Sequence, residues 1–215
     1  MVNSVEARSR RKALVVGLLV TLAATGGCDD GGSARPRAVT TSPIVGAPAT
    51  SSPPPAVDSL YDATNLDLCR RTDLAPLADL SVKVARTDPK PPLARQGSSC
   101  LFAMRTADDH QANLLVEASS LTSAEEAGRL YTATQQVTAM TADGFLADVG
   151  EEAEGFVKRS DPGFKYTEYM VHARGANLVV KVWLAVGGDS YLSKQVLAAK
   201  ALAILKATYT AVPHA

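Results

Sequence analysis

The strongest constraint on the fold of this 215-residue chain is that its first 57 residues offer little material for a packed core. A basic start at 8–12 is followed by an apolar run at 13–25, two glycines and Cys28. The apolar run is shorter than the ~20 residues that a transmembrane helix needs. Residues 29–57 are mostly Pro, Ser, Thr, Ala and Gly, a composition that buries too little apolar surface to offset the entropy of ordering. Folding is therefore left to residues 58–215, the length of one domain.

The order of basic residues, apolar run, small residues and cysteine resembles the export signal of a bacterial lipoprotein. The resemblance implies a signal peptide at 1–27, a lipidated Cys28 as the first mature residue, and a disordered Pro/Ser/Thr-rich linker at 28–57. Thr25 stands where such signals usually have leucine, and a plain signal peptide or an uncleaved anchor are the alternatives. Two or more acyl chains anchor a protein stably to a membrane. We therefore expect an exported protein held at the outer face of the cell membrane by lipid on Cys28.

The parts of the chain differ in charge although the whole is formally neutral. Six of the 22 basic residues and three of the 22 acidic residues precede position 58, so residues 58–215 carry a formal charge of −3. Nucleic-acid binding needs a basic face, so nucleic acid is not an expected partner. The membrane is expected as a partner through the N-terminal lipid only.

Two cysteines remain after Cys28, and an even pair in an exported domain predicts a disulfide. A Cys69–Cys100 bond would close a loop of about 32 residues and stabilise the fold by roughly 3–4 kcal/mol. The alternative is a metal or redox pair. Such a site needs a CxxC spacing or a nearby histidine, and the sequence has neither. We expect no metal and no cofactor.

Hydrophobic periodicity predicts the element order βββ-α-βββ-α with a short helix in front. The expected strands span 82–87, 100–106, 111–119, 154–158, 164–174 and 177–186. The expected helices span 73–80, from 122 or 123 to about 140, and from 189 onward, where Leu192, Val196, Ala199, Ala203 and Leu205 should face the sheet. This order predicts an α+β domain, with an antiparallel sheet packed by two long helices and a short helix near its start.

Four short elements carry a resemblance to a known family: Cys69 before Thr72, Cys100 before Phe102, the run Gly150-Glu151-Glu152-Ala153, and the late hairpin 174–180. Over about 67–205 the chain resembles the actinobacterial envelope lipoproteins of unknown function that share a cysteine pair. Arg70-Arg71 stands where that family usually has two leucines, and Phe102 where it usually has Trp. The resemblance implies a sandwich similar to PsbP-like α+β domains and no known enzymatic activity.

Aromatic residues on the predicted hairpin are the weak candidates for ligand binding. Tyr166, Tyr169 and Trp183 lie on its two strands, and aromatic residues are enriched at interfaces. Core packing is the alternative role for all three.

No catalytic set stands out, so no catalytic residue is assigned and the chain is not expected to be an enzyme. Glu151, Glu152 and Glu154 could serve acid–base chemistry or bind calcium, but they lack the calcium-loop spacing and also suit a solvated turn. His110 and His172 are isolated in sequence and suit surface or packed positions.

These observations predict a lipid-anchored, non-catalytic binding or sensing module of the cell envelope, whose partner is an envelope protein or a small apolar ligand. One alternative is a carrier that holds an apolar or lipid ligand between sheet and helices, which needs a dry pocket of ~300 Å³ or more. A hydrolase with a cryptic site is the other, and it needs a nucleophile, a base and an orienting group within hydrogen-bond reach.

Overall fold

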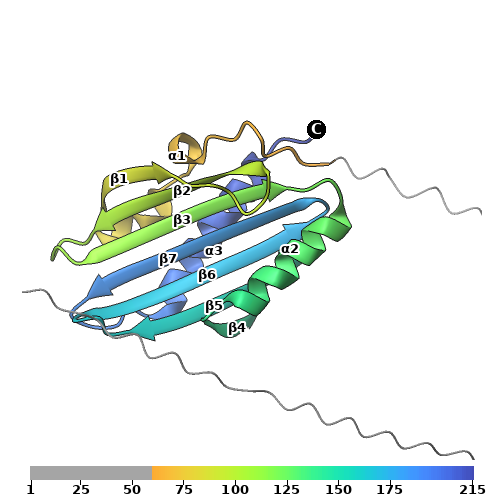
Figure 1. The fold of residues 1–215 in the computed structure, drawn as a ribbon. Coiled ribbons are helices and arrows are strands. Elements are labelled where there is room, and N and C mark those ends of the chain that lie inside the picture. The colour runs from red at the N-terminus through yellow and green to blue at the C-terminus, as the bar shows by residue number, and fades with distance from the viewer. Residues whose placement is uncertain (1–59) are drawn as a thin grey trace, which may run out of the picture. The chain divides into compact units, whose positions relative to one another are not determined.

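A seven-stranded antiparallel sheet dominates the computed structural model, which describes residues 60–215 (Figure 1). The strands are β1 (Lys83–Pro89), β2 (Gln96–Arg105), β3 (Gln111–Ser120), β4 (Thr141–Phe145), β5 (Glu152–Ser160), β6 (Lys165–Gly175) and β7 (Leu178–Gly188). They lie in the order β1-β2-β3-β7-β6-β5-β4. The helices are α1 (Leu68–Arg71), the 3-10 helix η1 (Ala75–Leu80), α2 (Ala124–Val137) and α3 (Lys194–Ala211).

The main hydrophobic core lies between the sheet and α3. On β7, alternate residues from Leu178 to Val186 are buried against this side, since successive side chains of a strand point to opposite faces. The buried residues of α3 are Leu197, Ala201, Ile204, Leu205 and Thr208. Their spacing is helical. The prediction is confirmed for Leu205, and Leu192 packs partly buried against the core, but it is wrong for Val196, Ala199 and Ala203, which are not among the buried residues.

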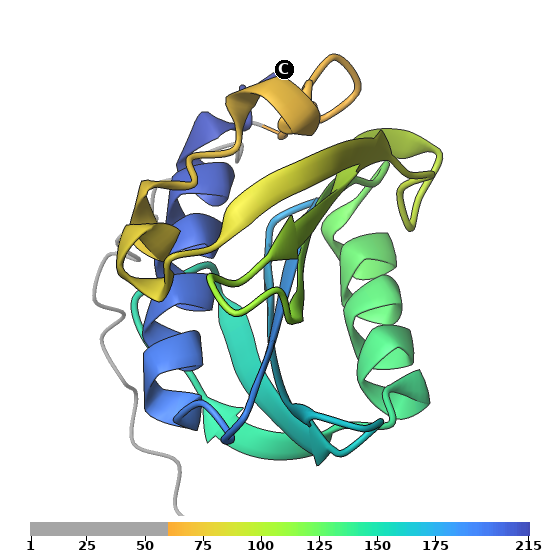
Figure 2. The same cartoon turned by 90° about the vertical axis from the view of Figure 1, so that its left-hand side faces the viewer.

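Helix α2 lies on the opposite side of the sheet from α3 (Figure 2). Ser123, one of the two predicted starting positions, caps it by accepting a hydrogen bond from the Glu126 amide at 3.2 Å. Only Ala127 and Tyr131 of α2 are buried. The α+β class is confirmed, but the expected packing by two long helices is wrong: strand dominates, and of the two long helices only α3 covers the main core.

Several boundaries differ from the sequence-based ones. The helix expected to reach about 140 ends at Val137, and residues 141–145 instead form the edge strand β4, which was not predicted. Gly144 has φ 104°, a value that suits glycine, and a register break between Ala142 and Gly144 bends β4 beside β5. Strand β2 starts at Gln96, inside the expected loop.

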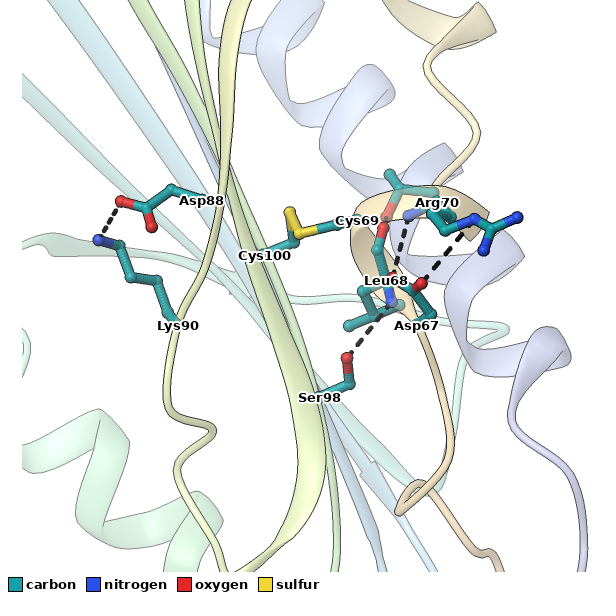
Figure 3. Close-up of a disulfide and its surroundings, with 9 residues drawn as sticks. Asp67, Leu68, Cys69, Arg70, Asp88, Lys90, Ser98 and Cys100 are labelled. Carbon is teal, nitrogen blue, oxygen red and sulfur yellow. Dashed lines mark hydrogen bonds and ion pairs between the residues drawn. A yellow bond between two sulfur atoms is a disulfide. The ribbon is translucent and has the colours of Figure 1, made fainter.

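The predicted Cys69–Cys100 disulfide is present and ties α1 to β2 (Figure 3). Beside it, the Leu68 amide donates a hydrogen bond to Ser98 Oγ at 3.3 Å. Asp67 accepts a hydrogen bond from the Arg70 amide and so caps the short α1. The disulfide therefore fastens the N-terminal segment of the domain to β2 on the side of the sheet that α3 covers.

The N-terminal assignments concern a part of the chain that the structure does not describe. Cys28, the signal peptide at 1–27 and the linker at 28–57 all lie outside residues 60–215. Among those residues, no helix is long and apolar enough to cross a membrane.

Candidate functional site

The three aromatic candidates from the hairpin do not share one surface. Tyr166 and Trp183 lie on the face that α2 occupies, where Tyr166 accepts a hydrogen bond from Asn113 Nδ2 at 2.9 Å and Trp183 Nε1 donates one to Glu168 at 3.2 Å. Tyr169 is buried in the core on the α3 side. Positions 166 and 169 are an odd number of residues apart on one strand, which places them on opposite faces.

A row of polar side chains crosses five strands on the face that α2 occupies. Cross-strand pairing places these residues side by side: Ser99, Glu117, Lys181, His172 and Glu154. Lys181 and Glu117 form a buried ion pair, and Gln135 of α2 donates a hydrogen bond to Glu154 at 2.7 Å. We call this set the polar row.

His172 lies between Lys181 and Glu154 in the polar row and is fully buried. The ring of Tyr131 stacks on it, with the centroids 4.5 Å apart, and neither ring nitrogen of His172 has a hydrogen-bond partner among residues 60–215. Burial, aided by the positive charge of Lys181, lowers the pKa of His172 to about 3. The imidazole is therefore neutral near pH 7 and serves packing rather than proton transfer.

His110 has a different setting, in an exposed pair with Asp189 at 3.1 Å. A carboxylate that orients a histidine is one part of a hydrolytic site. Within residues 60–215, no hydrogen bond joins the ring of His110 or His172 to a serine or threonine hydroxyl. Neither histidine therefore has an activated nucleophile beside it in this structure.

The acidic run and the late hairpin, far apart in sequence, meet in space. Arg174 donates hydrogen bonds to Glu151 at 2.7 Å and to Glu152 at 2.8 Å. The amide of Ala176 donates another to Glu151 at 2.9 Å, and the Glu151 amide donates to the Arg174 carbonyl at 2.7 Å. These bonds to Arg174 lower the pKa of Glu152 below its usual value. Both carboxylates are bound by Arg174.

No group of three or more metal-ligating side chains is suitably placed among residues 60–215. Glu151, from the acidic run, lines a surface pocket. Its cavity volume is about 340 Å³, and it is lined by Tyr61, Gly150, Glu151, Gly175, Ala176, Tyr209 and His214. We call it the aromatic pocket.

Three aromatic rings from the two ends of the domain stand together at this pocket. The ring of Tyr61 lies 5.5 Å from that of Tyr209, edge to face, and 4.3 Å from that of His214. Burial, with the nearby Tyr61, raises the pKa of Tyr209 above its usual range, so its hydroxyl stays neutral. Apolar ring surface thus lies beside the charged wall formed by Glu151.

Asn177 holds the start of the domain beside the hairpin. Its buried side chain accepts a hydrogen bond from the Tyr61 amide at 2.7 Å and donates to the carbonyls of Tyr61 at 2.9 Å and Leu121 at 2.8 Å. Tyr61 in turn pairs with His214 as an isolated β-bridge. Figure 1 shows the C-terminus close to the start of the described chain, on the same side as α1.

Two glycines leave the space that the pocket needs. A Cβ on Gly175 would lie 2.1 Å from the Tyr209 hydroxyl, and a Cβ on Gly150 would lie 2.3 Å from the Arg174 carbonyl oxygen. Gly150 also has φ 61°, where side chains are rarely tolerated. Larger residues at either position would displace the walls of the pocket.

Sequence reasoning missed the aromatic pocket. Tyr61, Tyr209 and His214 lie in the first and last few residues of the domain, with no pattern that links them. The available signal was the pair of glycine-containing elements around Glu151 and Arg174, which were noted for a family resemblance and not as neighbours. Comparison of the chain with protein-family models, with curated proteins and with solved structures finds no match.

Proposed function

We propose that this chain is a lipid-anchored extracytoplasmic binding module of the cell envelope, and that its ligand site is the aromatic pocket. The observation that carries the proposal is the pocket itself, in which three rings and the Glu151 carboxylate surround about 340 Å³. Pockets of ~300 Å³ or more with a few placed polar groups are the usual form of small-molecule sites. The proposed role is capture of a ligand without chemical change.

The lipoprotein-type leader supports the proposed location. Acylation of Cys28 would anchor the mature chain, and residues 29–57 would let the domain reach away from the membrane. The Cys69–Cys100 disulfide fits an oxidising compartment outside the cytosol. An envelope protein remains the alternative partner in this proposal.

The carrier function receives less support. The space between the sheet and α3, where an apolar ligand was expected, is occupied by core side chains such as Leu114, Tyr169 and Leu197, each at most 2 % exposed. An apolar guest there would have to displace them, and tightly packed cores resist such changes in volume.

Cell fractionation tests the proposed location. We expect the wild-type chain in the membrane fraction and open to a protease added to intact cells. The matched variant Cys28→Ser removes the acylated thiol and should release the chain from the membrane. Equal membrane association of both chains, or protection of the wild type from the protease until lysis, would contradict the proposal.

A further inference from the structure

The charged cluster to which Glu151 of the aromatic pocket belongs is negative overall. Glu151 and Glu152 each carry one negative charge, and Arg174 between them carries one positive charge, so the cluster keeps one net negative charge. Side-chain exposure is 54 % for Glu151 but only 18 % for Arg174. A ligand that enters the pocket therefore meets a carboxylate more readily than a guanidinium.

Both carboxylate oxygens of Glu151 already accept a hydrogen bond. One oxygen accepts from the Ala176 amide and the other from Arg174 Nη1. A ligand that donates a hydrogen bond to Glu151 would have to reach the lone pairs that these two partners leave open. A cation that needs no hydrogen bond gains from the field of the carboxylate without disturbing them.

The remaining wall is ring surface. The faces of aromatic rings are electron-rich, and they attract cations that are weakly hydrated, quaternary ammonium groups above all. Here the rings of Tyr61, Tyr209 and His214 stand around the pocket, next to the carboxylate. An anion would meet a carboxylate at the same place and is disfavoured.

We propose that the aromatic pocket binds a quaternary ammonium group, held by the rings of Tyr61, Tyr209 and His214 and by the negative charge of Glu151. This inference rests on the proposed function for the location of the site, and it adds the ligand class. The pocket volume of about 340 Å³ also leaves room for a small substituent on the ammonium group.

A second tyrosine in the chain supplies a matched control. Tyr191 is 38 % exposed, and its ring lies 5.4 Å from the Arg159 guanidinium and 5.5 Å from Lys165 Nζ. It is therefore a surface tyrosine whose ring already has cations beside it, and it does not line the aromatic pocket. Replacing it should not alter the pocket.

The test is calorimetric titration of the purified full chain with choline and with its neutral carbon isostere, 3,3-dimethylbutan-1-ol. Choline should bind at least about five-fold more tightly than the isostere, the lower range expected of a cation beside aromatic rings. Tyr61→Leu and Glu151→Gln should each weaken choline binding by about five-fold or more, and Tyr191→Leu should leave it unchanged. Amide hydrogen exchange of each variant would establish that the domain remains folded.

The outcomes separate the ligand class from the site. Equal binding of choline and the isostere, both weakened by Tyr61→Leu, would overturn the ammonium assignment and leave the aromatic pocket as a ligand site. If Tyr61→Leu and Glu151→Gln both leave choline binding unchanged, choline does not bind at the aromatic pocket, and the proposed site is overturned. Absence of choline binding to the wild-type chain would overturn the inference, while the Cys28→Ser fractionation still decides the proposed location.

Discussion

Acid should destabilise this domain through His172 before it affects most carboxylates. The side chain is fully buried, its pKa is lowered from 6.5 to about 3, and the groups that face it are Tyr131, Lys181 and Glu154. Below pH 6.5 His172 binds a proton in the unfolded chain but not in the folded chain. The unfolding free energy therefore decreases as the pH is lowered, down to about pH 3. Each pH unit in that window costs about 1.4 kcal/mol.

A fall from pH 7.5 to 4.5 crosses about two of those units, so His172 alone should remove roughly 2.5 kcal/mol of unfolding free energy. The assay is urea unfolding at a series of pH values, followed by the fluorescence of Trp183, the single tryptophan. His172→Phe keeps an aromatic ring against Tyr131 but has no proton to bind. The stability difference between variant and wild type should therefore widen in favour of the variant as pH falls.

The carboxylates are the same in both proteins, so their contributions to the pH dependence of the unfolding free energy cancel in the difference between wild type and variant. Glu152 and Asp143 have lowered pKa values, so their contributions are lost only as pH falls below about 4.5. If wild type and His172→Phe lose stability in parallel between pH 6.5 and 4.5, then His172 is protonated in the folded state, and the argument from burial is refuted.

Three further predictions concern the stability of the domain. Asn177→Ala removes three buried hydrogen bonds and should cost roughly 3 kcal/mol in urea unfolding; a loss below about 1 kcal/mol would mean that water replaces the side chain. Reduction of the disulfide should lower the unfolding free energy by roughly 3–4 kcal/mol, and an unchanged midpoint in dithiothreitol would contradict this. Lys181→Met leaves Glu117 buried without its partner and should cost about 3–5 kcal/mol, most of which Lys181→Met/Glu117→Leu should restore; a double variant no more stable than the single one would count against the buried ion pair.

Local chemistry in the sequence predicted the parts of the fold that depend on near neighbours. The Ser123 cap, the hairpin of β6 and β7 and the disulfide each follow from residue types at short spacing or from simple counting. The strand β4 could not be found this way. Residues 141–145 are mostly exposed, and they form a strand only because the edge of β5 offers them backbone partners.

The candidate site was less predictable, because it depends on contacts between distant segments. Tyr61 is held by Asn177 and pairs with His214 as an isolated β-bridge, contacts that no periodicity in the sequence indicates. Strand parity predicts that Tyr166 and Tyr169 lie on opposite faces of the sheet once the strand is assigned. Parity alone, however, could not show which face of the sheet α3 covers.

Native mass spectrometry of the full-length protein, extracted in mild detergent from its own membrane, tests the central claim most directly. We expect a chain that starts at an acylated Cys28 and retains a small cationic ligand, which the Tyr61→Leu variant loses. An unacylated chain that carries no ligand, or one whose ligand is retained unchanged by the variant, would contradict a membrane-anchored binding module with its site at the aromatic pocket.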